Sequence, residues 1–175
     1  SPKVGGHCIA IDPFYLSWKA REYNFWARFI ELAGELNEQM PHYVMTNTIS
    51  FLNKNNKHLN GSKVLILGVA YKKDIGDPRE SAAYDIVPNL QRKGASVDYY
   101  DPYIPEFIYF DMYQKVCKTL KRINYSPEIL KNYDLVMILT DHSNMDYDQI
   151  AQNSKLIVDT RNAIKNRKYN NISWF

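Results

Sequence analysis

The sequence predicts an α/β protein in which a long, bent helix precedes a parallel β-sheet. Apolar side chains recur at the helical spacing of three and four residues from Phe25 to Leu52. Beyond this segment, continuous apolar runs alternate with helical patterns, as in parallel sheets that helices cover on both faces. With 175 residues, of which 45% are hydrophobic and 14% aromatic, the chain is long enough to bury a core around these elements.

The first twenty or so residues combine a glycine-led loop with a short helix. The loop covers residues 4–12, and Asp12 is expected to be the N-cap of the helix because its side chain can accept a hydrogen bond from an unpaired backbone amide. Pro13 suits the first helical position, where no intrahelical N–H bond is lost. The pattern places the end of this helix at about Arg21.

A much longer helix is predicted from about Phe25 to the Asn-Gly pair at residues 60–61. Its apolar stripe comprises Phe25, Phe29, Leu32, Leu36, Met40, Val44, Ile49 and Leu52. Pro41 removes a backbone hydrogen bond and clashes with the carbonyl of Asn37, so it either separates two helices or bends one. Because no turn residue accompanies Pro41 and the apolar register continues, one bent helix is favoured. The stripe needs a partner, and a second copy of the chain is the expected one.

The rest of the chain has the pattern of a Rossmann-like domain. Strands are expected at residues 64–70, 96–100, 135–140 and 155–159, separated by helices at 81–93 and 147–153. Residues 104–131 are expected to be irregular, with a short helix near 127–132. The chain is therefore divided into a loop-and-helix unit at 1–60 and a Rossmann-like unit at 61–175.

Composition argues against several classes of partner and location. The formal charge of +3 comes from 22 basic and 19 acidic residues, and the basic residues are not clustered as a nucleic-acid surface requires. No segment is apolar enough over about 20 residues to cross a membrane. The first residues lack the apolar core of a signal peptide, and the two cysteines are too few for a disulfide framework. A cytoplasmic protein with reduced thiols is expected.

A possible phosphate site follows the first predicted strand. In open α/β sheets, ligands bind beyond the carboxyl ends of the strands. Lys72 and Lys73 stand there, and Arg79 precedes the next helix, where backbone N–H groups also favour phosphate. The segment lacks the Gly-x-Gly-x-x-Gly turn of dinucleotide sites. Lysine-bound nucleotide phosphate and ordinary surface lysines are both consistent with this pattern.

Cys8 is a candidate nucleophile near the start of the chain. Gly5 and Gly6 allow the backbone to approach a ligand, and Cys8 lies just ahead of a helix N-terminus, which favours a thiolate. A thiolate can attack an aldehyde, and the nearby Asp12 carboxylate could then help to activate water. The alternative is that Cys8 is a small core residue and Asp12 only an N-cap. His7 is an adjacent candidate base, and Cys117 has no partner motif.

The motifs together resemble the UDP-glucose/GDP-mannose dehydrogenase family. The segment VGGHCIAIDPFYL at residues 4–16 resembles its catalytic-cysteine motif, and GVAYKKDIGDPRES at 68–81 resembles the motif that opens its UDP-binding domain. The segments YDPY at 100–103, TDH at 140–142 and VDTRN at 158–162 follow in the family's order. Residues 17–23 and 38–44 are most similar to the branch that acts on UDP-N-acetylhexosamines.

The resemblance implies a four-electron oxidation of the sugar C6 alcohol to a carboxylate, with two NAD+ consumed and a cysteine thioester formed. It implies that Cys8 is the nucleophile and that Asp12 assists water activation. It implies that Tyr71, Lys72 and Arg161 contact the UDP-sugar, and we expect Gly5 and Gly6 to belong to the same substrate-binding site. It assigns an NAD contact to Arg79, and it implies a homodimer whose core is the long helix.

The chain departs from the family in lacking a segment with the Gly-x-Gly-x-x-Gly turn that binds NAD. We therefore expect it to be the C-terminal portion of such an enzyme, specific for UDP-N-acetylglucosamine or UDP-N-acetylmannosamine and inactive alone. Two other interpretations stay open. The chain could be a non-catalytic nucleotide-sugar-binding module, or a dimerisation domain that binds no nucleotide. No metal site is assigned.

Overall fold

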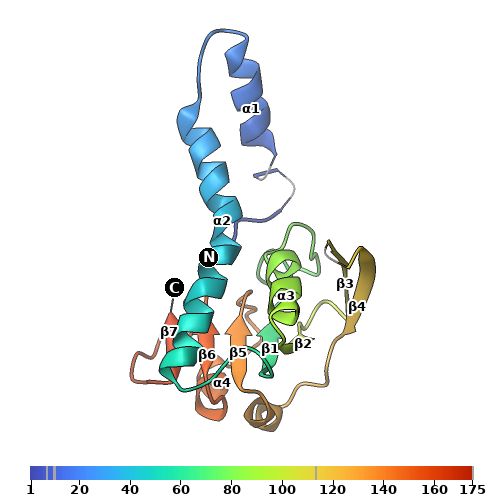
Figure 1. Cartoon of the computed structure of the whole chain (residues 1–175), viewed down its shortest axis with the longest axis vertical. Helices are drawn as coiled ribbons and strands as arrows, with labels where there is room; N and C mark the ends of the chain where they lie inside the picture. Colours follow the sequence, from blue (N-terminus) through green and yellow to red (C-terminus); the bar gives the residue numbers. More distant parts are fainter. Residues whose placement is uncertain (7, 10, 113, 175) are drawn as a thin grey trace.

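A pair of helices projects from an α/β unit in the computed structural model, which describes residues 1–6, 8–9, 11–112 and 114–174 (Figure 1). The projection consists of α1 (Asp12–Arg21) and the first half of α2 (Arg28–Lys54). Helix α2 continues through Pro41, which confirms one helix rather than two. It begins three residues later than predicted and ends at Lys54, short of the Asn-Gly pair.

The α/β unit contains a five-stranded parallel sheet in the order β2-β1-β5-β6-β7. Its strands are β1 (Lys63–Leu67), β2 (Ser96–Tyr100), β5 (Leu135–Ile138), β6 (Ile157–Asp159) and β7 (Ile172–Trp174). Every neighbouring pair is parallel, as the alternation of strands and helices predicts. Strand β7 was not predicted, because it has only three residues and extends the sheet solely through its pairing with β6.

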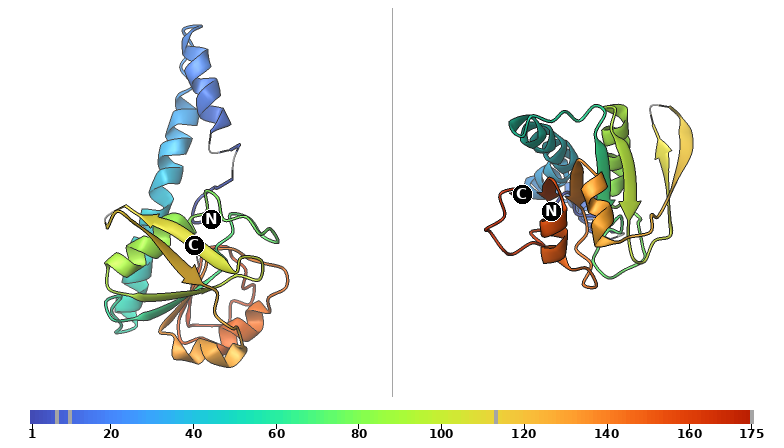
Figure 2. Two further views of the ribbon diagram at one scale, coloured as in Figure 1. Left: turned by 90° about the vertical axis from the view of Figure 1, so that its right-hand side faces the viewer. Right: turned by 90° about the horizontal axis from the view of Figure 1, so that it is seen from below.

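Helices cover both faces of this sheet, giving three layers (Figure 2). Val64 and Ile66 of β1 pack on one side with α3 (Ala83–Arg92) and the second half of α2. Leu65 and Leu67 pack on the other side with the 3₁₀ helix η1 (Pro127–Asn132) and α4 (Tyr147–Asn153). Burial on both faces explains why β1 is a continuous apolar run instead of an alternating one.

An antiparallel hairpin replaces the irregular segment that was expected after residue 104. Strand β3 (Glu106–Asp111) pairs with β4 (Val116–Lys121) as a separate two-stranded sheet. Phe107 and Tyr109 are buried while Ile108 and Phe110 are exposed, so β3 has the two-residue alternation of a half-buried strand. The prediction of irregular structure here was wrong because that alternation is short and β4 lacks it.

Strand β1 ends at Leu67, three residues earlier than predicted, and this ending creates the loop that carries the candidate site. Gly68 has a φ of +80°, and a Cβ there would lie 2.5 Å from the carbonyl oxygen of Thr140. The turn therefore requires glycine because neither its backbone conformation nor its neighbour admits a side chain. Residues 69–82 leave the sheet at its carboxyl edge.

Candidate functional site

Most of the predicted site residues meet in one cavity at the carboxyl edge of the sheet. The cavity has a volume of about 450 Å³ and lies between the N-terminal segment, the loop after β1 and the loop after β6. It is lined by Ser1, Lys3, Val4, Gly5, Gly6, Cys8, Ile9, Tyr71, Lys72 and Arg161. The thiol-bearing segment and the Tyr71-Lys72 pair, which are more than 60 positions apart in the sequence, therefore face the same space.

The two glycines before Cys8 are needed for packing of the protein against itself. A Cβ on Gly5 would lie 2.2 Å from the carbonyl oxygen of Glu80, and one on Gly6 would lie 3.1 Å from the ring of Tyr71. Gly6 also has a φ of +96°. The sequence predicts that these glycines admit a ligand, whereas in the structure both contact the loop after β1. That packing brings Cys8 to the cavity.

Asp12 lies beside Cys8 but lines a neighbouring hollow. This hollow of about 310 Å³ is formed by Cys8, Ile9, Asp12, Pro13 and Leu16. The expectation that Asp12 caps α1 was wrong, because Ile11 occupies the N-cap position and no side-chain hydrogen bond caps the helix. Instead the amide of Asp12 donates to the carbonyl of Cys8 at 2.8 Å, within the first turn. His7, the other candidate base, lies outside the described residues.

Arg161 enters the cavity from the loop after β6, and neighbouring residues orient it. Its Nε donates to Asp141 Oδ1 at 2.9 Å, and its Nη1 donates to Ser1 Oγ at 2.9 Å. Asp159 holds the loop by accepting from the backbone amides of residues 161, 163 and 164 at 2.9–3.1 Å. Only the resemblance pointed to Arg161 in advance, and Asp141 was given no role although it lies in the TDH segment and directly follows a predicted strand.

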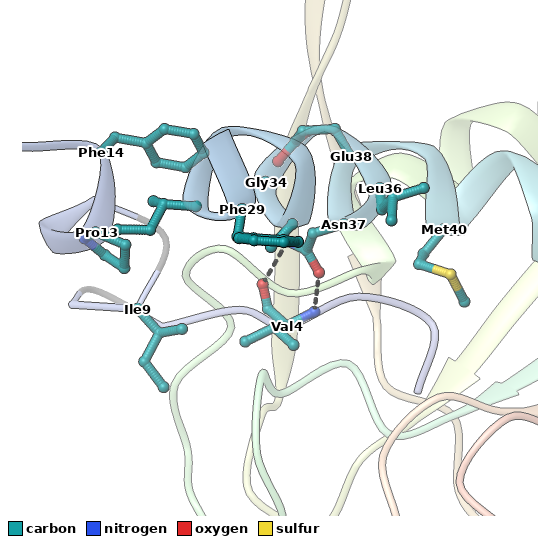
Figure 3. A pocket seen from close by; sticks show the side chains of 12 residues that line it. Val4, Ile9, Pro13, Phe14, Phe29, Gly34, Leu36, Asn37, Glu38 and Met40 are labelled. Carbon is teal, nitrogen blue, oxygen red and sulfur yellow. Dashed lines mark hydrogen bonds between the residues drawn. The ribbon is translucent and has the colours of Figure 1, made fainter. Parts of the chain in front are cut away.

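The N-terminal segment is bound to both structural units. Lys3 donates to Glu38 of α2 at 3.1 Å and to Asp85 of α3 at 3.2 Å. Burial alone would lower the pKa of Lys3, but Asp85 and Glu38 together raise it. Asn37 accepts from the amide of Val4 at 2.7 Å and donates to its carbonyl at 3.1 Å (Figure 3). Sequence reasoning missed Lys3, which lies ahead of the recognised motif.

Arg79 does not reach the cavity of Cys8. It lines a separate hollow of about 450 Å³ with Lys3, Ile11, Glu80, Ser81, Tyr84 and Asp85. Its side chain is 66% exposed, and its Nη2 donates to Asp77 Oδ2 at 2.7 Å. The hydrogen bond to Asp77 raises the pKa of Arg79. Because the guanidinium of Arg79 is exposed at the edge of this hollow, it can contact a group that is not part of this chain.

The projection has a large exposed apolar surface. A groove of about 490 Å³ runs between the N-terminal segment, α1 and α2, and Val4, Phe14, Phe29 and Leu36 are among its lining residues (Figure 3). Phe29 is 88% exposed and Leu36 is 54% exposed. The predicted apolar stripe of α2 is thus divided, because its second half packs on the sheet while its first half faces outward.

The described residues form neither a membrane-spanning helix nor a cluster of metal ligands. No helix in this part of the chain combines the length and apolarity that crossing a bilayer requires. Among these same residues, no group of three or more His, Cys, Asp or Glu side chains is arranged to hold a metal ion.

A parallel sheet with a cationic cavity beyond the carboxyl ends of its strands is the arrangement of ligand-binding Rossmann-like domains. Comparison with protein families matches residues 65–166 to the UDP-binding domain of the UDP-glucose/GDP-mannose dehydrogenase family. Residues 1–39 match the central domain of the same family. The chain therefore belongs to the UDP-glucose/GDP-mannose dehydrogenase family, as the motifs indicated.

Individual relatives agree with this assignment. Over 171 residues the chain is 33% identical to the UDP-N-acetyl-D-mannosamine dehydrogenase of Methanococcus vannielii, covering 93% of this chain and 36% of that protein. Over 101 residues it is 35% identical to a UDP-N-acetyl-D-glucosamine 6-dehydrogenase of Pseudomonas aeruginosa, covering 58% of this chain and 24% of that one. The matched regions thus span 36% and 24% of the length of these two curated relatives.

A solved structure confirms the Rossmann-like α/β fold. The structure of a UDP-D-ManNAc dehydrogenase from Pyrococcus horikoshii superposes with a TM-score of 0.76 at 25% identity, covering 98% of this chain and 38% of that one. A UDP-N-acetyl-mannosamine dehydrogenase from S. aureus superposes with a TM-score of 0.68 at 31% identity, covering 99% of this chain and 38% of that one.

Proposed function

We propose that this chain forms the substrate side of an NAD-dependent UDP-sugar 6-dehydrogenase and that the cavity beside Cys8 binds the UDP-sugar. The observation that carries the proposal is the meeting of Cys8 with Lys72 and Arg161 around one cavity of about 450 Å³. Two cations at one cavity, of which Arg161 is held by Asp141, suit a diphosphate because charge-assisted hydrogen bonds to phosphate are the strong ones. Tyr71 adds an aromatic wall next to Gly6.

Cys8 and Asp12 are the proposed reactive groups. The exposed Cys8 sulfur, once deprotonated, would add to the C6 aldehyde carbon of the sugar, and the carbonyl π bond would break as its oxygen takes up a proton to give a hemithioacetal. The hemithioacetal would become a thioester by losing its hydroxyl proton to solvent and a hydride to NAD+. Water would then attack the carbonyl carbon, the carbon–sulfur bond would break, and the Cys8 sulfur would leave as a thiolate. Asp12, which lines the adjoining hollow with Cys8, would accept the proton of that water.

The described residues fit NAD only at one edge. After β1, Gly68 is packed against Thr140, so no open glycine-rich cradle for a pyrophosphate follows this strand. Arg79, exposed at the rim, is the residue that would contact the cofactor. NAD+, when bound, supplies the hydride acceptor. We propose that the oxidised sugar is UDP-N-acetylmannosamine or UDP-N-acetylglucosamine, the sugars named in the relatives with the sequence similarity reported above.

We also propose that the chain forms a homodimer. Each copy would consist of a loop-and-helix unit at residues 1–60 and a UDP-sugar-binding unit at 61–175, and the protein would be cytoplasmic. The dimer is supported by the outward-facing first half of the α2 stripe, since an apolar surface of this kind marks an interaction site. Sedimentation of the wild-type chain and of Leu36→Asp tests it. We expect a dimer that the substitution dissociates, and a monomeric wild type would contradict the proposal.

Calorimetric titration with UDP tests the binding site. We expect Lys72→Ala to weaken binding by about tenfold or more, because the substitution removes a charged partner of phosphate. Lys73→Ala is the matched control, since Lys73 is adjacent in sequence but does not line the cavity. The proposal fails if the wild-type chain does not bind UDP or if both lysine variants bind as the wild type does.

Thiol modification separates a catalytic pocket from a binding module without catalysis. Cys8 and Cys117 are both exposed, so accessibility alone predicts similar alkylation of the two. We expect an alkylating agent to modify Cys8 faster and UDP-N-acetylglucosamine to protect only Cys8. Equal rates for the two thiols would favour a non-catalytic nucleotide-sugar-binding module, and the absence of UDP binding would favour a dimerisation domain.

A further inference from the structure

Two fully buried polar side chains support the loop that carries Tyr71 and Lys72. This loop, residues 69–82, has no strand or long helix of its own, so its conformation depends on contacts with the rest of the fold. Asp101 follows β2 and His142 follows β5, and the exposed fraction of each side chain is 0%. Buried polar groups of this kind are stable only when hydrogen-bonded, so their partners show what they hold in place.

Asp101 fixes the first residues of the loop. Its Oδ2 accepts from the amides of Val69 at 2.8 Å and Ala70 at 3.1 Å, and its Oδ1 accepts from the amide of Tyr103 at 2.9 Å. Burial would raise the pKa of Asp101, but the hydrogen bonds from His142 and from these amides lower it below the ordinary value. Asp101 is therefore a buried carboxylate that accepts backbone donors at the point where the chain leaves β1.

His142 links this carboxylate to Asp74, which follows Tyr71 and Lys72 in the loop. Its Nε2 lies 3.0 Å from Asp101 Oδ2, and its Nδ1 lies 3.0 Å from the amide nitrogen of Asp74. Because an amide N–H can only donate, Nδ1 is the acceptor, and the ring is a neutral imidazole that donates from Nε2. The carboxylate of Asp74 makes two further hydrogen bonds. It accepts from the amide of Ser143 at 2.7 Å and from the hydroxyl of Ser143 at 2.6 Å.

We propose that His142 is a positioning residue, whose imidazole bridges Asp101 and the Asp74 amide and thereby presents Tyr71 and Lys72 to the cavity. The anchors at residues 69–70 and at 74 flank the two site residues on either side in sequence. Each anchor depends on a side chain from a different strand end. The expected effect of His142 on UDP affinity rests on the proposed binding of a UDP-sugar. The anchoring of the loop does not, because it can be measured without ligand.

Two conservative variants separate positioning from simple packing. In His142→Asn, the side-chain oxygen can take the place of Nδ1 and keep the acceptor for Asp74. In His142→Gln, the longer side chain can keep the donor to Asp101 but leaves the Asp74 amide without its acceptor. We expect amide exchange at Asp74 to rise about tenfold in the Gln variant and to stay near the wild-type rate in the Asn variant. UDP affinity should follow the same order, falling about tenfold in His142→Gln and recovering in His142→Asn.

Each outcome decides between the two roles. Equal exchange at Asp74 in the two variants, or an unchanged UDP affinity when Asp74 is released, would overturn the positioning role. Nitrogen NMR shifts of the imidazole provide a readout in the wild-type chain, and a protonated Nδ1 would also overturn it. If the wild type does not bind UDP, the proposed function fails, while the exchange measurements still test the bridge.

Discussion

The α/β unit and the helical projection bury their apolar side chains to opposite extents. In the unit, the fully buried side chains include Tyr99, Phe107, Ile66 and Met137. Of the described side chains of α1, Ser17 alone is buried, and it is held by a hydrogen bond to Glu31 at 2.9 Å. The unit is therefore stabilised by its own core, whereas the projection leaves an apolar surface that another surface can cover.

The largest expected effect is on the free energy of unfolding, when a core side chain of the α/β unit is compared with an exposed side chain of the projection. Ile66→Ala should lower the free energy of unfolding by about 2–5 kcal/mol, because it removes a fully buried side chain and leaves a cavity. Phe29→Ala, at a side chain that is 88% exposed, should change it by less than about 0.5 kcal/mol in dilute solution. Denaturant unfolding at low protein concentration measures both, and similar costs would refute the contrast.

A smaller effect is expected where the N-terminal segment packs on the α/β unit. Gly5→Ala should cost about 1–3 kcal/mol or release the segment, because the new Cβ meets the rigid carbonyl of Glu80. Gly61→Ala is the control, since no atom lies within 4 Å of its Cβ and only its φ of +82° is unfavourable. Hydrogen exchange of residues 3–6 should increase in the first variant alone. Increased exchange in both would show that general destabilisation, and not the contact with Glu80, releases the segment.

Acid should act mainly on the α/β unit. The pKa of Asp101 is lower in the folded chain than its ordinary value, so its contribution to stability is present above about pH 4 and is lost as the pH falls further. Asp101→Asn should remove this dependence and lower stability at neutral pH. Hydrogen bonds from Arg21 and Ser17 also lower the pKa of Glu31, but Glu31→Gln should change the acid midpoint less because the projection adds little core. Thermal unfolding between pH 2 and 7 compares them.

The smallest expected effect concerns the ion pairs that join the two regions. Lys3→Gln removes the pairs with Glu38 and Asp85, whose carboxylates are 68% and 42% exposed. The cost should be below about 1 kcal/mol and should shrink in high salt. Lys19→Gln, which removes a pair with Glu22 at the C-terminal end of α1 and joins no other region, is the matched control. A salt-independent loss in the Lys3 variant would mean that its buried stem, not its charge, joins the regions.

Much of the fold could be predicted from the sequence because burial leaves a local pattern. The runs of β1 and β5 are apolar at every position after the first residues, as a strand covered on both faces requires. Strand β4 and strand β7 carry no such pattern, since each depends on one partner strand for its definition. The boundary at Gly68 depends on a contact with Thr140, which no local pattern reports.

The candidate site was less predictable than the fold. Cys8, Tyr71, Lys72 and Arg161 were named from motifs, and the cavity brings them together. The geometry separates Asp12 and Arg79 into neighbouring hollows, which the motif spacing did not indicate. The supporting roles of buried groups such as His142 depend on contacts between residues about 40 to 70 positions apart, so the linear sequence could not show them.

The hydrogen bond between Arg161 and Ser1 joins residues 160 positions apart. During synthesis, Cys8, Tyr71 and Lys72 leave the ribosome long before Arg161 does. The binding cavity can therefore gain its Arg161 side only after synthesis has passed β6 (Ile157–Asp159). Formation of such distant contacts is a slow, late event in folding, so ligand affinity should appear after the helices and central strands are already ordered.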